Sequence, residues 1–127
     1  MNPIKMKEII EKYVRAYNSF DIEGMIALLH EEIEFRNISS GSIDVETKGI
    51  GKFREIAEQS KSLFTYRCQT IVGYSFEDDK TQVEIDYEGI IAADLPNGMK
   101  AGEKIHTKGK SVFEFRDEML AVIEDHS

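Results

Sequence analysis

Asp125 is the residue of this sequence best suited to move a proton. Alternate residues of a strand share one face, so Asp125 lies on the same side as Ala121 and Ile123 in residues 119–126. A carboxyl group that faces an apolar interior has a raised pKa and can act as an acid or a base. The alternative is a frayed, solvated carboxylate near the end of the sequence.

Two tyrosines and an asparagine could hold the oxygen atoms of a ligand. Tyr13 and Tyr17 lie one helical turn apart on the apolar face of residues 3–18, where core packing and ligand contact are both open. Phe35 and Asn37 share the inward face of a short expected strand. A buried amide needs hydrogen-bond partners, so we expect Phe35 and Asn37 to line a pocket.

Further pocket residues are expected on two later strands. In the strand expected over residues 81–93, acidic side chains occupy one face, and Tyr87 lies on the opposite, apolar face. Thr107, Ser111 and Phe113 share the inward face of residues 103–116. We expect these four side chains to contact a ligand.

Metal and cofactor sites are not indicated. The histidines at 30, 106 and 126 lack the spacing of metal ligands, and Gly49-Ile50-Gly51-Lys52 lacks the spacing of a phosphate-binding loop. We therefore expect neither a metal nor a cofactor.

The elements that position these residues follow from the periodicity of apolar side chains. Helical spacing predicts helices over residues 3–18, from residue 21 to about 29, and over 50–63. Period-two alternation predicts strands over 33–38, 66–76, 81–93, 103–116 and 119–126, and the small polar residues 39–49 predict a loop. Gly73, Gly89 and Gly109 inside strands favour a strongly bent sheet.

Helices grouped before antiparallel strands predict an α+β fold. We expect a single cone-shaped domain over residues 1–127, in which three N-terminal helices pack on a strongly curved mixed or antiparallel sheet. A bent sheet closed by helices leaves a hollow, which is the usual place for a ligand.

The composition of the chain limits the kinds of binding partner and the compartment to expect. The formal net charge of −8 disfavours nucleic acid and anionic membrane surfaces. Cys68 is the only cysteine, which excludes an intrachain disulfide and fits a reducing compartment. No apolar stretch reaches the roughly 18 residues of a membrane span, so a cytoplasmic protein is expected.

Four segments carry a resemblance to a known superfamily. Residues 13–18, 21–29, 48–54 and 112–120 resemble, in order and spacing, the nuclear transport factor 2-like superfamily, and within it the ketosteroid isomerases and SnoaL-like polyketide cyclases. The resemblance covers nearly the whole chain. It implies the cone fold but no single activity, because this superfamily contains isomerases, cyclases, hydrolases, dehydratases and non-catalytic binders.

The resemblance also assigns roles to particular residues. Tyr13 falls where ketosteroid isomerases have an oxyanion-donating tyrosine, Asn37 where they have the aspartate base, and Ser111 where they have a protonated aspartate. An amide cannot take the proton that a carboxylate takes, so isomerisation through residue 37 is excluded.

A second likeness concerns Asp125, which resembles the catalytic aspartate on the last strand of limonene-epoxide-hydrolase-like members. Those enzymes also have an arginine and an aspartate on a neighbouring strand. The nearest residues here, Glu84, Asp86 and Glu88, include no arginine and are expected to face outward. That catalytic triad is therefore incomplete.

Three functions remain open. The first is a cofactor-independent isomerase, cyclase or dehydratase that acts on a small hydrophobic oxygenated molecule, with Asp125 and Tyr13 as catalytic residues. The second is a non-catalytic binding module. The third is an interaction module whose hollow is filled by its own aromatic side chains.

A homodimer through the outer face of the sheet is also expected. Several apolar residues should point outward from the strands, which is more apolar surface than a free monomer needs. They are Val72, Ile90, Val112, Leu120 and Val122.

Overall fold

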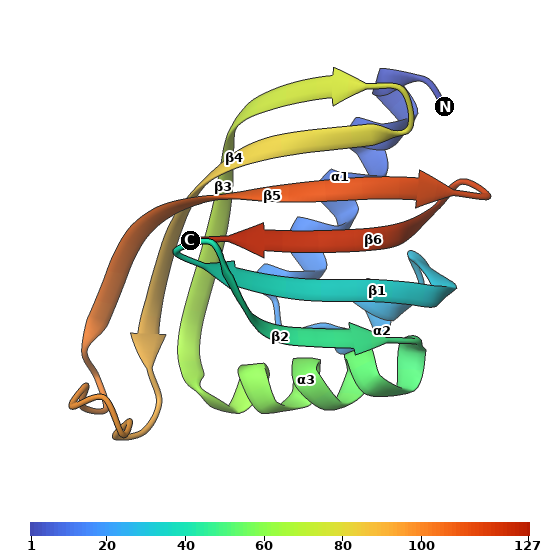
Figure 1. The fold of residues 1–127 in the computed structure, drawn as a ribbon. Coiled ribbons are helices and arrows are strands. Elements are labelled where there is room, and N and C mark those ends of the chain that lie inside the picture. The colour runs from blue at the N-terminus through green and yellow to red at the C-terminus, as the bar shows by residue number, and fades with distance from the viewer.

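The computed structural model describes residues 1–127 and consists of three helices and one six-stranded sheet (Figure 1). The helices are α1 (Pro3–Asn18), α2 (Ile22–Ile26) and α3 (Ile50–Ser62). The strands are β1 (Leu29–Ser39), β2 (Ser42–Lys48), β3 (Phe64–Glu77), β4 (Lys80–Ile91), β5 (Lys104–Arg116) and β6 (Met119–His126). The α+β fold expected from the sequence, with helices packed on a mixed sheet, is confirmed.

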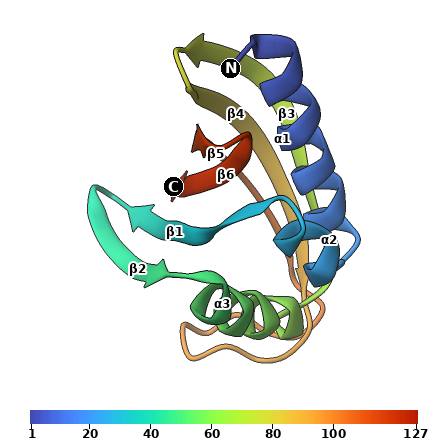
Figure 2. The same cartoon turned by 90° about the vertical axis from the view of Figure 1, so that its right-hand side faces the viewer.

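The sheet joins the first strands of the chain to the last one. Its order is β2-β1-β6-β5-β4-β3, and every neighbouring pair is antiparallel except β1 and β6, which are parallel. The sheet is strongly curved; α1 lies behind it in the view of Figure 1, and α3 lies beneath β2 (Figure 2). This topology places Asn37 of β1 directly beside Asp125 of β6.

Helix α1 forms because its sequence satisfies both the helix start and the core. The Asn2 side chain accepts a hydrogen bond from the Lys5 backbone N–H over 2.8 Å, and Pro3 occupies the first turn. One face is buried against the sheet and presents Met6, Ile9, Ile10, Tyr13, Val14 and Ala16. Tyr13 and Tyr17 therefore extend from a well-packed helix.

The second helix is shorter than its apolar spacing predicts. It ends at Ile26, and the chain enters β1 at Leu29, so the helix expected up to about residue 29 is wrong. Leu29 lies opposite Leu120 of β6, and the Leu120 backbone N–H donates to the Leu28 carbonyl over 3.0 Å. Pairing with the last strand thus overrides the helical periodicity of two leucines.

Residues 39–49 are also not a loop as expected. They contain β2, which pairs antiparallel with β1 and has no other neighbour in the sheet. Most of its side chains are exposed, so its sequence lacks the alternation of a half-buried strand.

One of the apolar residues expected on the outer face of the sheet, Leu120, does not lie there. Leu120 has no exposed surface, because the β5–β6 pairing shifts between Glu114 and Phe115 and turns Leu120 into the core. Val112 and Val122 remain half-buried on the outer face, where acidic and basic side chains surround them. Glu124 of β6, for example, lies opposite Val112 and accepts a hydrogen bond from Nε of Arg36 over 3.0 Å.

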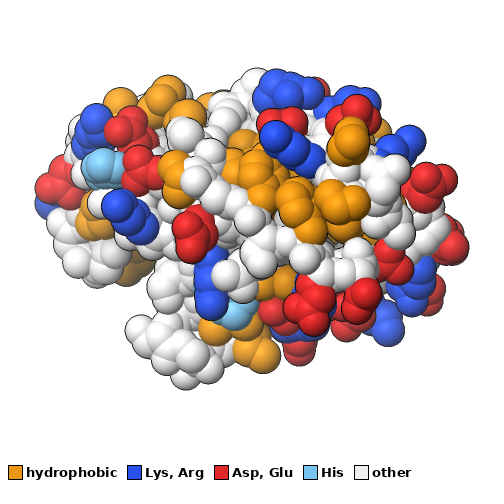
Figure 3. All heavy atoms as spheres, turned by 90° about the horizontal axis from the view of Figure 1, so that it is seen from above, with side chains coloured by type: hydrophobic (Ala, Val, Ile, Leu, Met, Phe, Trp, Pro, Cys, Tyr) orange, Lys and Arg blue, Asp and Glu red, His pale blue; other side chains and the backbone are white.

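Hydrophobic and charged side chains share the visible surface. Seen from above, hydrophobic side chains gather near the middle of the molecule, with lysine, arginine and acidic side chains around them (Figure 3). None of the helices has the length and apolar character needed to cross a membrane.

Candidate functional site

A cavity of about 420 Å³ lies between the helices and the sheet. Sixteen residues line it, and eleven of these are hydrophobic. Six are aromatic and come from helices α1 and α3 and strands β1, β3 and β4: Tyr13, Tyr17, Phe35, Phe53, Phe64 and Tyr87. An apolar wall of this size, interrupted by a few polar groups, is typical of small-molecule sites.

Asp125 occupies the polar part of this wall. Asn37, Asp125 and Ser111 are direct neighbours across β1, β6 and β5, and the Ser111 hydroxyl donates to Oδ1 of Asp125 over 2.6 Å. Burial raises the pKa of the Asp125 carboxyl group, while the Ser111 hydrogen bond and His126 lower it in part. Asp125 is therefore a desolvated carboxyl group at a cavity wall, which suits proton transfer.

Tyr13 faces the same cavity from α1 and is buried. Burial raises the pKa of its hydroxyl group well above the ordinary value, and the negative charge of Asp125 raises it further. The hydroxyl group therefore stays protonated and can only donate or share its proton at neutral pH. A protonated phenol near a carboxylate is a suitable donor to a ligand oxygen.

Tyr17 and Tyr87 form a hydrogen-bonded pair inside the cavity. Their hydroxyl oxygens lie 3.0 Å apart, and their rings meet edge to face with centroids 6.4 Å apart. The ring of Tyr87 also packs against Phe64. Burial raises the pKa of both hydroxyl groups.

A smaller cavity of about 220 Å³ adjoins the first one. Tyr17, Asn37, Tyr87 and Asp125 line both cavities, and Thr107 and Ser111 line the smaller one only. Two of the three pocket residues expected on β5 thus line the smaller cavity and not the larger one. Asn37 makes no side-chain hydrogen bond to another protein group, which leaves its amide free for a ligand.

Comparison with known proteins identifies the family of this chain. Residues 10–123 match the SnoaL-like domain. The chain belongs to the SnoaL-like domain family. This confirms the resemblance to the nuclear transport factor 2-like superfamily that the sequence motifs carry.

Solved structures share the SnoaL-like fold at low sequence identity. A candidate polyketide cyclase from Xanthomonas campestris pv. campestris is 17% identical with a TM-score of 0.84, covering 100% of this chain and 93% of that one. TsrD from Streptomyces laurentii is 20% identical with a TM-score of 0.80, covering 98% and 89%.

A protein of ketosteroid isomerase-like fold from Catenulispora acidiphila, crystallised with trimethylamine, is 14% identical with a TM-score of 0.79, covering 100% and 87%. A comparison with curated protein sequences gives no match. Identities this low establish the fold alone.

Phe113 does not line either SnoaL-like cavity, although the sequence predicts that it contacts a ligand. It is buried in the core, and its ring meets that of Tyr13 edge to face at 5.8 Å between centroids. Phe35 does line the larger cavity and packs edge to face on Phe53. Phe113 therefore supports Tyr13 from behind.

Arg67 lines the larger cavity and was not among the sequence candidates. It lies on β3 and is only 2% exposed. Its Nε donates to the Tyr17 carbonyl over 2.8 Å, and its guanidinium carbon lies 3.7 Å from the centroid of the Tyr17 ring. The sequence signal for its position is its spacing from Ile71: the two residues are four positions apart on one strand and so share a face, and Ile71 packs against the core.

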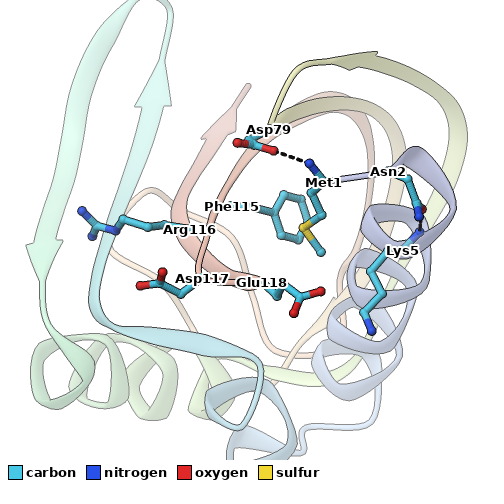
Figure 4. A pocket seen from close by; sticks show the side chains of 8 residues that line it. All are labelled: Met1, Asn2, Lys5, Asp79, Phe115, Arg116, Asp117 and Glu118. Carbon is cyan, nitrogen blue, oxygen red and sulfur yellow. Dashed lines mark hydrogen bonds and ion pairs between the residues drawn. The ribbon is translucent and has the colours of Figure 1, made fainter.

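A separate groove of about 490 Å³ lies at the other end of the SnoaL-like domain (Figure 4). Only two of its eight lining residues are hydrophobic, and the amino group of Met1 lies 2.8 Å from Oδ1 of Asp79 across it. None of the predicted site residues lies there. No group of three or more histidine, cysteine or acidic side chains is placed to hold a metal ion.

Proposed function

We propose that this chain binds a small hydrophobic, oxygenated molecule in the larger cavity and catalyses cofactor-independent proton transfer on it. The reaction would be of the isomerase, cyclase or dehydratase kind. The observation that carries the proposal is the desolvated carboxyl group of Asp125 at the wall of an aromatic cavity, opposite protonated tyrosine hydroxyl groups.

The proposed step is proton abstraction beside a carbonyl group. The Asp125 carboxylate takes a proton from a carbon atom next to the carbonyl, and the electron pair of the broken C–H bond moves to the carbonyl oxygen. Tyr13 donates a hydrogen bond to the enolate oxygen that forms, and Asp125 then returns its proton to carbon. Such a positioned base typically contributes about 10²–10⁴-fold in rate.

The other candidate residues would orient the ligand. The Asn37 amide and the Tyr17–Tyr87 hydroxyl pair would contact its oxygen atoms, and Phe35 would contact its apolar body. Thr107 would bind a substituent that reaches the smaller cavity. Ser111 donates to Asp125, so its proposed role is to hold the carboxylate in place rather than to bind the ligand.

A second candidate function is non-catalytic binding of the same kind of molecule. It is favoured by Asn37, an amide where ketosteroid isomerases have their base, and by the mutual hydrogen bond of Tyr17 and Tyr87. The third interpretation, an interaction module whose hollow is filled by its own side chains, predicts that no cavity of ligand size exists. A cavity of about 420 Å³, within the ordinary range of ligand pockets, argues against that third interpretation.

Hydrogen–deuterium exchange distinguishes the two leading functions. We expect the chain to accelerate α-proton exchange of 2-tetralone, a bicyclic ketone, in deuterated buffer followed by proton NMR. Asp125→Asn should reduce that acceleration about 10²-fold or more. Asp44→Asn, which changes an exposed acid on β2, should leave it unchanged. Binding of the ketone without exchange would favour the non-catalytic function.

We also propose a homodimer through the outer sheet face. On β3, Val72 is 64% exposed and Tyr66, which lies opposite the half-buried Ile90, is 45% exposed. Analytical ultracentrifugation should then give a dimer for the unmodified chain and a monomer for Val72→Asp. A monomer at all concentrations would overturn this assembly.

A further inference from the structure

Arg67 is a buried cation without a carboxylate partner. It is 2% exposed, and no acidic side chain lies within ion-pair distance of its guanidinium group, although the chain carries 24 acidic residues. Buried charges in proteins are normally paired, because an isolated charge loses its hydration without compensation. This absence is therefore informative.

The protein satisfies only part of the guanidinium group. Of its five N–H donors, Nε–H bonds to the Tyr17 carbonyl over 2.8 Å, and one Nη1–H makes a long contact of 3.4 Å with the Ser60 hydroxyl. The flat faces of the group lie against aromatic rings, with the guanidinium carbon 3.7 Å from the Tyr17 centroid and 4.5 Å from the Phe20 centroid. The Arg67 side chain also interacts with the Tyr17 hydroxyl group, and no acidic side chain takes up its remaining N–H donors.

These free donors belong to the cavity. Arg67 and Ser60 both line the larger cavity, at whose wall Asp125 also lies. The hydroxyl groups of Tyr13 and Tyr17 feel both charges, since Asp125 raises the pKa of each and Arg67 lowers it. The wall of the cavity thus carries both a cation and an acid, and both act on the tyrosine hydroxyl groups.

We infer that Arg67 anchors a carboxylate group of the ligand, so that the cavity selects hydrophobic, oxygenated carboxylic acids. The inference rests on the proposed function, because it names the substrate class of the same cavity. The carboxylate would accept two hydrogen bonds from the planar guanidinium group, a geometry that arginine favours. The apolar body would lie against Phe53 and Phe64, and the oxygenated end would reach Tyr13 and Asp125.

The test compares two probes of nearly equal shape, 2-naphthoate and the neutral 2-naphthamide, by isothermal titration calorimetry. We expect the unmodified chain to bind the carboxylate about ten- to a hundredfold more tightly than the amide. Arg67→Gln should abolish this preference while leaving the affinity for the amide within about threefold. Arg67→Lys should retain only part of it, because an ammonium group cannot form the bidentate pair.

Two controls separate the anchor from the proposed function and from folding. Arg15→Gln removes an exposed arginine of α1 and should preserve the preference. Asp125→Asn should also preserve it while reducing the acceleration of proton exchange on 2-tetralone about 10²-fold or more. Equal binding of the two probes to the unmodified chain overturns the anchor and leaves the proposed function intact. Binding of neither probe overturns the anchor, whereas absence of exchange on 2-tetralone overturns the proposed function, and neither result depends on whether any variant folds.

Discussion

The hydroxyl oxygens of Tyr17 and Tyr87 lie 3.0 Å apart, which links the last turn of α1 to the middle of β4. The pair stands where the two cavities adjoin, and each hydroxyl group serves as the other's partner. This contact ties the helix to the curved sheet at the site itself.

We predict that this hydroxyl pair is energetically coupled. Tyr17→Phe and Tyr87→Phe should each lower the free energy of unfolding by about 0.5–1.5 kcal/mol, because each leaves a buried hydroxyl group without a partner. The double variant should lose less than the sum of the two. Urea unfolding of the four proteins measures the coupling. Strict additivity would show that the two hydroxyl groups do not interact.

A second prediction concerns alkaline pH. Burial raises the pKa of Tyr13, Tyr17 and Tyr87 above the ordinary value of about 10. The unfolded chain therefore releases these protons at a lower pH than the folded chain, and stability falls as the pH rises above about 10.

Phenolate absorbance of the folded chain should stay low at pH 10 and rise together with unfolding at higher pH. A full tyrosine titration near pH 10, with the fold retained by circular dichroism, would contradict this expectation.

Asp125 should destabilise the fold at neutral pH. Burial raises the pKa of its carboxyl group above the ordinary 3.8, so the folded chain holds this proton more tightly than the unfolded chain. The protonated carboxyl group therefore favours the folded state at pH values below 3.8, and this contribution to stability disappears as the pH rises through the higher pKa of the folded chain.

Asp125→Asn should consequently increase the free energy of unfolding at pH 7, and the gain should shrink towards pH 3.5. Chemical denaturation at both pH values checks this, with the exposed Asp44→Asn as the control. A loss of stability at pH 7 would show that the charged carboxylate is well solvated or compensated.

Most of the fold could be predicted from the sequence because long periodic segments specify their own structure. The alternation in residues 81–93 and the helical spacing in 3–18 both correspond to elements of the protein. Strand β2 could not be found in this way, because most of its side chains face solvent and no apolar face marks it. Leu120 could not be placed, because a bulge in the β5–β6 pairing changes the alternation locally.

The candidate site was predictable only in part, for a related reason. Parity along β6 placed Asp125 inward beside Ile123, and helical spacing placed Tyr13 and Tyr17 on one face. Parity alone does not separate a cavity wall from solid core, so Phe113 was assigned to the ligand although it packs under Tyr13. Arg67 was missed because its burial depends on α1 and α3, which cover β3 from distant parts of the sequence.

We predict that Phe113 contributes to the stability of the fold. Phe113→Ala should lower the free energy of unfolding by about 3–5 kcal/mol, because it removes a fully buried ring from the core. The half-buried Val112→Ala, on the opposite face of the same strand, should cost about 1 kcal/mol or less. Guanidinium unfolding of both variants provides the comparison. Similar losses for the two would place Phe113 outside the tightly packed core.

Gly109 is the glycine whose replacement should be most damaging near the site. A Cβ atom built there would lie 2.7 Å from the His126 carbonyl oxygen, and backbone atoms of a sheet cannot give way as a side chain does. Gly109→Ala should therefore cost about 1–3 kcal/mol and shift β6 around Asp125, weakening ligand binding as well. Gly51→Ala, in the first turn of α3 with open space around it, should instead stabilise the chain by about 0.4–1 kcal/mol. Thermal unfolding of the pair measures the contrast; a neutral Gly109→Ala would mean that β5 and β6 do not approach this closely in solution.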